Sequence, residues 1–180
     1  MPSRVIVSLR VSTSPARAFE AFTRDIKSWW QPSDLFQVTP RGDGELAFEP
    51  PATGGEGRLI TTWAPGKVYE IGKVSVWEPG ERLRFGWRQA NFAPGQSTEV
   101  EVRFAAAKND SGGDETRVTV EHIGWDTIPE ASAARHGFPE GPFLQRTADW
   151  WRAHLARMRT VLSPPVYGGS AGEAGEGGSA

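Results

Sequence analysis

The chain has 180 residues, no cysteine and a formal net charge of −2, with 20 Lys and Arg against 22 Asp and Glu. The lack of cysteine excludes disulfides, thiolate metal ligands and thiol nucleophiles, and it fits a reducing cytoplasm. Because there is neither a basic excess nor a run of about 18 apolar residues, we expect no nucleic-acid partner and no membrane span.

The N-terminal segment begins without the basic and then apolar pattern of a secretory signal. From Arg4 to Val11 apolar and polar residues alternate, which predicts a half-buried strand. A helix is expected next, because Ser14 suits the N-cap and Pro15 suits the first helical position. Pro32 should end this helix, with the pair Trp29-Trp30 on the two edges of its apolar stripe.

The middle of the chain predicts an antiparallel sheet. Six segments alternate apolar and polar residues between Gly- and Pro-rich turns, so one face of the sheet should be dry and the other solvated. The apolar phase slips by one residue around Gly72, which predicts a β-bulge there. The six predicted strands are Glu45–Glu49, Arg58–Thr62, Val68–Trp77, Arg82–Trp87, Thr98–Ala106 and Thr116–Ile123.

The last predicted element is a long helix from about Pro142 to Leu162. Its apolar face is unusually wide, with Trp151 in the core stripe and Trp150 facing sideways. Such a helix fits inside a curved sheet, so the fold class is α+β with a helix-grip arrangement over residues 1–162. Residues 163–180 are rich in Gly, Ala, Ser and Glu, and we expect them to form a disordered tail.

Three motifs give the chain a family resemblance. "SPARAFEAFTRDIKSWW" resembles the first helix of homologues of the heat-shock-protein-90 ATPase activator, within the START-like (SRPBCC) superfamily. "EPGERLRFGW" is similar to the P-P-x-R-L-x-F-x-W hairpin of that family, although Gly80 replaces the second proline. "TVEHIGW" is similar to its T-x-x-H-x-G-F/W strand end, whereas Gly141-Pro142-Phe143 replaces the frequent Gly-Trp before the last helix. The resemblance covers residues 1–162 and implies a helix-grip fold with a cavity between the sheet and the last helix.

We expect the candidate ligand-binding residues to be aromatic. His122 shares strand parity with Val118 and Val120, so it should point into the interior near the end of its strand. It would be either a structural imidazole or a polar contact for a ligand. The three histidines of the chain are too far apart in sequence to predict a metal site, and the sequence indicates no cofactor and no acid–base pair. The full candidate set is Trp30, Phe36, Trp87, His122, Trp150 and His154.

Three functions remain open at the level of sequence. The first is non-enzymatic binding of a small hydrophobic or aromatic molecule between the sheet and the last helix. The second is a protein-interaction module, since the resemblance implies relatives that stimulate a chaperone ATPase. The third is a cyclase- or lyase-type enzyme, which the resemblance also allows. A closed apolar cavity would favour the first function, an exposed apolar patch the second, and a perturbed titratable group in the cavity the third.

Overall fold

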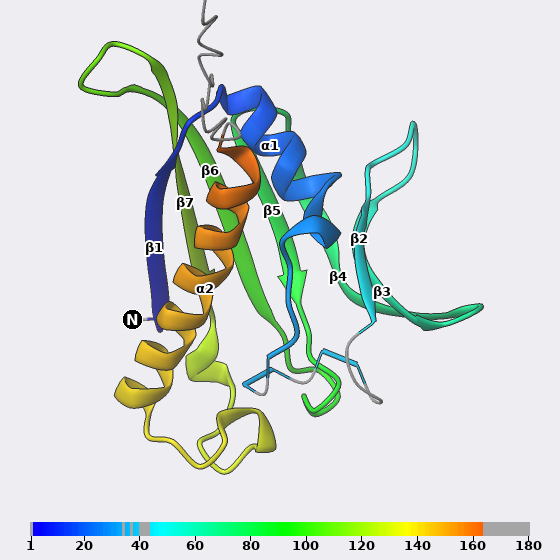
Figure 1. Ribbon diagram of the computed structural model, residues 1–180. Helices are drawn as coiled ribbons and strands as arrows, with labels where there is room; N and C mark the ends of the chain where they lie inside the picture. Colours follow the sequence, from blue (N-terminus) through cyan, green and yellow to red (C-terminus); the bar gives the residue numbers. More distant parts are fainter. Residues whose placement is uncertain (1, 34, 37, 40–43, 164–180) are drawn as a thin grey trace, which may run out of the picture.

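A computed structural model describes residues 2–33, 35–36, 38–39 and 44–163. Its seven strands form one antiparallel sheet that curves around the C-terminal helix α2, and the shorter helix α1 lies beside the end of α2 (Figure 1). Three 3₁₀ turns, η1 to η3, connect these elements. The helices and strands are β1 (Arg4–Val11), α1 (Pro15–Thr23), η1 (Ile26–Ser28), β2 (Glu45–Glu49), β3 (Gly57–Ala64), β4 (Lys67–Glu78), β5 (Arg82–Trp87), β6 (Thr98–Lys108), β7 (Asp114–Ile123), η2 (Trp125–Thr127), η3 (Ala133–Arg135) and α2 (Glu140–Leu162).

The strand order is β1-β7-β6-β5-β4-β3-β2, and each neighbouring pair is antiparallel. The first strand, β1, therefore pairs with the last strand, β7, and lies next to α2. The α+β helix-grip fold predicted from the sequence is confirmed. The alternating residues of each strand face α2 and form the core, as Val118, Val120 and His122 of β7 show with at most 1% exposure.

Two β-bulges in β4 bend the sheet near its centre, and the register of β3 and β4 shifts once more between Thr62 and Ala64. The register of β3 and β4 shifts at an extra residue, Ile71, and the register of β4 and β5 shifts at Ser75. The bulge predicted from the slip of apolar phase is thus present, one residue before Gly72. A Cβ atom on Gly72 of β4 would lie 1.8 Å from the carbonyl oxygen of Gly86 on β5. These two strands can therefore approach this closely only because residue 72 is glycine.

The first helix is shorter than the sequence predicts. Ser14 caps it as expected, but α1 ends at Thr23 and the chain tightens into the 3₁₀ turn η1. The amide of Asp25 donates to the carbonyl of Glu20, so the carbonyl of Ala21 lacks its usual helical partner. The indole Nε1–H of Trp29 donates to that carbonyl at 2.9 Å. The early helix end therefore turns Trp29 into the core. The sequence pattern predicts it on an edge of the apolar stripe instead.

The long helix α2 begins at Glu140, two residues earlier than predicted, and ends at Leu162 as predicted. The carbonyl of Pro139 accepts from the amide of Phe143, which closes the first turn. None of the helices in the described part of the chain is long and apolar enough to cross a membrane. The tail predicted over residues 163–180 lies, apart from Ser163, outside the described residues.

Candidate functional site

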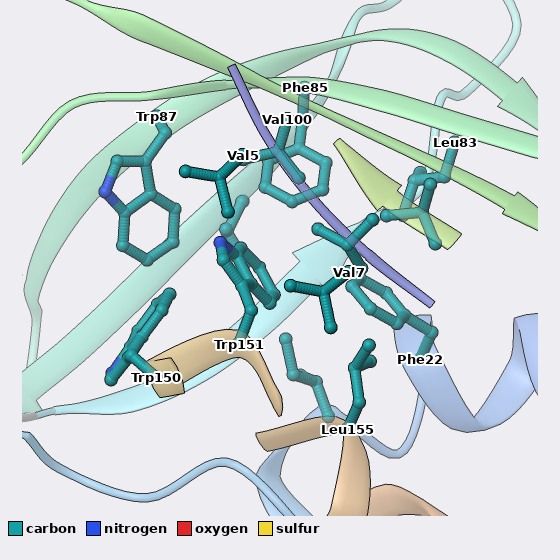
Figure 2. Packing of buried hydrophobic residues seen from close by; sticks show 14 of the residues in the cluster. Val5, Val7, Phe22, Leu83, Phe85, Trp87, Val100, Trp150, Trp151 and Leu155 are labelled. Atoms are coloured by element: carbon teal, nitrogen blue, oxygen red, sulfur yellow. The ribbon is translucent and has the colours of Figure 1, made fainter. Parts of the chain in front are cut away.

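The six candidate residues come together between the sheet and α2. Trp30 and Phe36 approach from the segment after α1, Trp87 and His122 from β5 and β7, and Trp150 and His154 from α2. Three further tryptophans complete the group, which we call the aromatic cluster. Its nine members are Trp29, Trp30, Phe36, Trp87, His122, Trp125, Trp150, Trp151 and His154. Figure 2 shows Trp87 on the sheet facing Trp150 and Trp151 on the helix.

Trp30 occupies the centre of the cluster although it is only half-buried. Its ring stacks on the imidazole of His154, with centroids 4.2 Å apart and planes at 11°. The edge of the neighbouring Trp150 ring meets it at 5.1 Å, and Trp87 and Trp151 lie within 5.9 Å. A flat side chain is therefore held on several sides by other aromatic rings.

A closed hydrogen-bond network surrounds His122. The indole of Trp151 can only donate, so its 3.1 Å bond makes Nδ1 of His122 an acceptor and leaves the proton on Nε2. That Nε2–H then donates to Oγ1 of Thr98 at 2.8 Å, and the Thr98 hydroxyl donates to the carbonyl of Trp87 at 3.0 Å. His122 points inward as predicted, but both of its nitrogens are already engaged. A ligand would have to displace one of these partners to bind it, so its expected ligand contact stays a prediction.

His154 differs from His122, because only one of its nitrogens is satisfied. The guanidinium of Arg157 can only donate, so Nδ1 of His154 accepts at 3.3 Å and Nε2 carries the proton. Within the described part of the chain this buried Nε2–H has no acceptor. The buried indole Nε1–H groups of Trp150 and Trp125 also have none there. Such groups are uncommon in native interiors, because an unmet donor costs about 1–3 kcal/mol.

Both buried histidines are neutral at pH 7. Burial lowers the pKa of His122 to about 3. Burial also lowers the pKa of His154 to about 3, with a further contribution from the charge of Arg157. The cluster therefore presents stacking surfaces and neutral N–H donors, and neither imidazole is poised to exchange a proton near neutral pH.

The expected cavity between the sheet and α2 is filled by the side chains of the cluster itself. Neighbouring rings are in contact, as the Phe36 and Trp150 centroids at 4.2 Å illustrate. Two hollows border the cluster from outside, one of about 430 Å³ beside Trp30 and one of about 450 Å³ beside Trp150. A larger surface groove of about 580 Å³ runs along α1 over Phe48 and Trp77, away from these residues.

The sequence signals missed part of the cluster. Trp125 is fully buried and its ring lies 4.9 Å from His122, because Gly124 adopts a left-handed conformation that folds the chain back. The glycine before Trp125 in "HIGW" was the available signal for this turn. Trp29 enters the cluster through the early end of α1, which hydrophobic periodicity does not reveal. Trp151 was predicted as core only, and it also orients His122.

No group of three or more metal-ligating side chains is found among the residues that the structure describes. His122 and His154 lie in the same cluster, but the nitrogens of His122 are both used by Trp151 and Thr98. The chemistry available in the cluster is therefore stacking, apolar contact and hydrogen-bond donation to an acceptor.

Known structures share this architecture at low sequence identity. DynU16, encoded in the dynemicin biosynthetic locus, matches with a TM-score of 0.55 and 20% identity over 88% of this chain. The chain spans 46% of the length of DynU16. Protein CV1439 from Chromobacterium violaceum matches with a TM-score of 0.53 and 17% identity, covering 91% of this chain and 100% of that one.

An HSP90 activator from Plasmodium falciparum, PFC0360w, matches with a TM-score of 0.52 and 17% identity, covering 88% of this chain and 95% of that one. These likenesses establish the fold alone. No curated protein matches the sequence. The model of the family described as "Activator of Hsp90 ATPase homolog 1-like protein" matches residues 12–163, which is most of the described domain. The chain belongs to this family of Hsp90 ATPase activator homologues, within the START-like superfamily.

Proposed function

We propose that the domain binds a small, flat, aromatic or apolar molecule in the aromatic cluster between the sheet and α2. The observation that carries this proposal is the position of Trp30, which lies between several aromatic rings in the way that a bound ligand would. It is only half-buried and belongs to the segment after α1, whereas the rings around it belong mainly to β5 and α2. Movement of Trp30 outward would open a slot about the size of an indole ring.

The surroundings of Trp30 support such a movement. The hollow beside Trp30 is lined also by Lys27, Ser28 and Pro32, so it offers space at the surface next to this ring. The walls that would remain are rigid, since Trp87 and Trp151 are fully buried and each takes part in a hydrogen bond. A preformed aromatic wall with one movable cover is suited to binding apolar molecules.

The interaction-module alternative has less support from the surface. It calls for a contiguous exposed patch of apolar side chains. Among the described residues the large exposed hydrophobics are Ile6, Val68 and Val161, and they lie on β1, β4 and α2. Single exposed apolar residues on separate elements are ordinary in folded domains. Because the side chains of the cluster fill the cavity that the sequence predicted, the proposal of ligand binding rests on the position of Trp30 and not on a preformed cavity.

Calorimetric titration with 1-indanone, a flat bicyclic ketone of indole size, tests this proposal. We expect one saturable site in the wild-type domain, with a Kd on the order of 1 mM or tighter for so small a ligand. Trp77→Ala is the matched control, because it removes a tryptophan from the groove along α1 and leaves the cluster intact. This variant should bind as the wild type does. Loss of binding in Trp77→Ala would locate the site in that groove and overturn the proposal.

A further inference from the structure

The groove along α1 lies apart from the aromatic cluster, and aromatic side chains form its floor. Trp77 of β4 contacts Phe19 of α1 and Phe48 of β2, with ring centroids 5.2 and 6.2 Å apart. Trp77 and Phe48 are only half-buried, and Pro50 and Pro79 line the same groove. Its volume of about 580 Å³ is typical of a binding pocket. The groove is therefore an apolar site that the aromatic cluster does not use.

The segment after α2 contains side chains that suit such a groove. Residues 164–180 lie outside the described part of the chain, and most of them are Gly, Ala and Ser. Val166 and Tyr167 are their only large apolar side chains, and they directly follow Pro164-Pro165. Two successive prolines favour an extended polyproline II conformation, which loses little conformational freedom on binding. Proline-rich segments of this kind bind to aromatic-lined grooves in several recognition domains.

We propose that residues 164–167 occupy the groove along α1, so that the chain covers its own apolar groove. The occupant is thus a segment of this chain, Pro-Pro-Val-Tyr, and the disordered tail expected from the sequence would begin at Gly168. The inference is independent of the proposed function, because the groove lies away from the aromatic cluster.

The length of the segment fits this position. The end of α2 lies on one flank of α1, and β2, which supplies Phe48, lies on the other (Figure 1). An α-helix with its side chains is roughly 10–12 Å across. The chain from Ser163, the last residue of the described part, to Tyr167 spans at most about 14 Å when extended. The segment is therefore long enough to pass over α1 and to bring Tyr167 into the groove.

The charges of the groove and the tail are complementary. Arg17, Arg24 and Glu20 are the charged residues that line the groove, so positive charge exceeds negative charge there. The tail carries Glu173 and Glu176 and neither Lys nor Arg. Opposite charges would draw the tail toward the groove, and salt would weaken this attraction.

Limited proteolysis of the full chain with chymotrypsin, which cleaves after tyrosine, tests the inference. The rate of cleavage is measured by mass spectrometry as the appearance of the fragment that ends at Tyr167. A docked Tyr167 is cleaved only when the segment leaves the groove, so the rate follows the undocked fraction. We expect Trp77→Ala to raise this rate about tenfold over the wild-type chain, because it removes the central ring of the floor. Phe48→Ala, which removes a second ring, should also raise it.

Trp63→Ala is the matched control, because Trp63 is also a half-buried tryptophan on a strand but lines a separate hollow beside β2. This variant should be cleaved at the wild-type rate. Equal rates in the wild-type chain and both groove variants, or an equal rise in Trp63→Ala, would overturn the inference. A wild-type rate that falls as the protein concentration rises would place the segment of a second copy in the groove, which also contradicts it. Each of these results would leave the titration with 1-indanone unaffected.

Discussion

Trp151→Ala should remove about 5 kcal/mol from the free energy of unfolding, measured by urea denaturation. The side chain is fully buried, and truncation of such a residue to alanine costs about 3–5 kcal/mol. The variant would also leave Nδ1 of His122 without its donor, which adds about 1–3 kcal/mol. This sum is comparable with the whole stability of many domains, so the variant should be close to unfolding.

Two further variants separate the causes. Asp149 lies on the exposed side of α2, where its carboxylate pairs with Arg152. Asp149→Ala should therefore reduce the free energy of unfolding by less than about 0.5 kcal/mol. Trp151→Phe keeps most of the ring but loses the N–H, so its cost should fall between the two alanine variants. Equal losses for Trp151→Ala and Asp149→Ala would show that α2 does not present Trp151 to the core in solution.

Acidification from pH 7 to pH 5 should destabilise the domain by about 4 kcal/mol through its two buried histidines, about 2 kcal/mol from each. In the unfolded chain an imidazole has a pKa of about 6.5. In the folded chain the pKa values of His122 and His154 are lowered to about 3. Below pH 6.5 the unfolded chain therefore binds protons that the folded chain does not, and the free energy of unfolding falls until about pH 3.

Urea denaturation at pH 7, 6 and 5 measures this dependence. His154→Gln and His122→Gln should each remove about half of the loss between pH 7 and pH 5, whatever their stability at pH 7. His136→Gln replaces the third imidazole of the chain, which is exposed and lies outside the aromatic cluster, and it is the comparison variant. A pH dependence that is the same in all three variants would show that the buried histidines are not its source.

Strand alternation predicted most of the fold because one face of the sheet is dry. The segments Arg4–Val11, Glu45–Glu49 and Arg82–Trp87 are found with the predicted bounds. The early end of α1 was not predicted, because it goes with a hydrogen bond from the side chain of Trp29 to the backbone carbonyl of Ala21, eight residues earlier. Periodicity describes which face of a helix is apolar, but it does not reveal where a side chain replaces an amide as the partner of a helical carbonyl.

The sequence predicted that these residues lie between the sheet and α2, but not that their side chains fill the space there. Strand parity placed His122 in the interior, and helical spacing placed Trp150 and His154 on one side of α2. The sequence does not show how much volume the six tryptophans of the cluster fill once they meet. It also does not show hydrogen bonds across the core, such as the one that makes His122 a part of the framework.

The central claim is that Trp30 occupies a slot that a flat ligand can take. Trp30→Ala should leave that slot open between Trp87, Trp150 and His154, and indole, the ring that the substitution removes, should bind in it. The direct measurement is the melting temperature of Trp30→Ala with and without millimolar indole. We expect a rise of several degrees in the variant, since a ligand that binds only the folded state stabilises it, and a smaller rise in the wild-type domain, where Trp30 competes. An equal shift in the two proteins, or none in the variant, would contradict the claim.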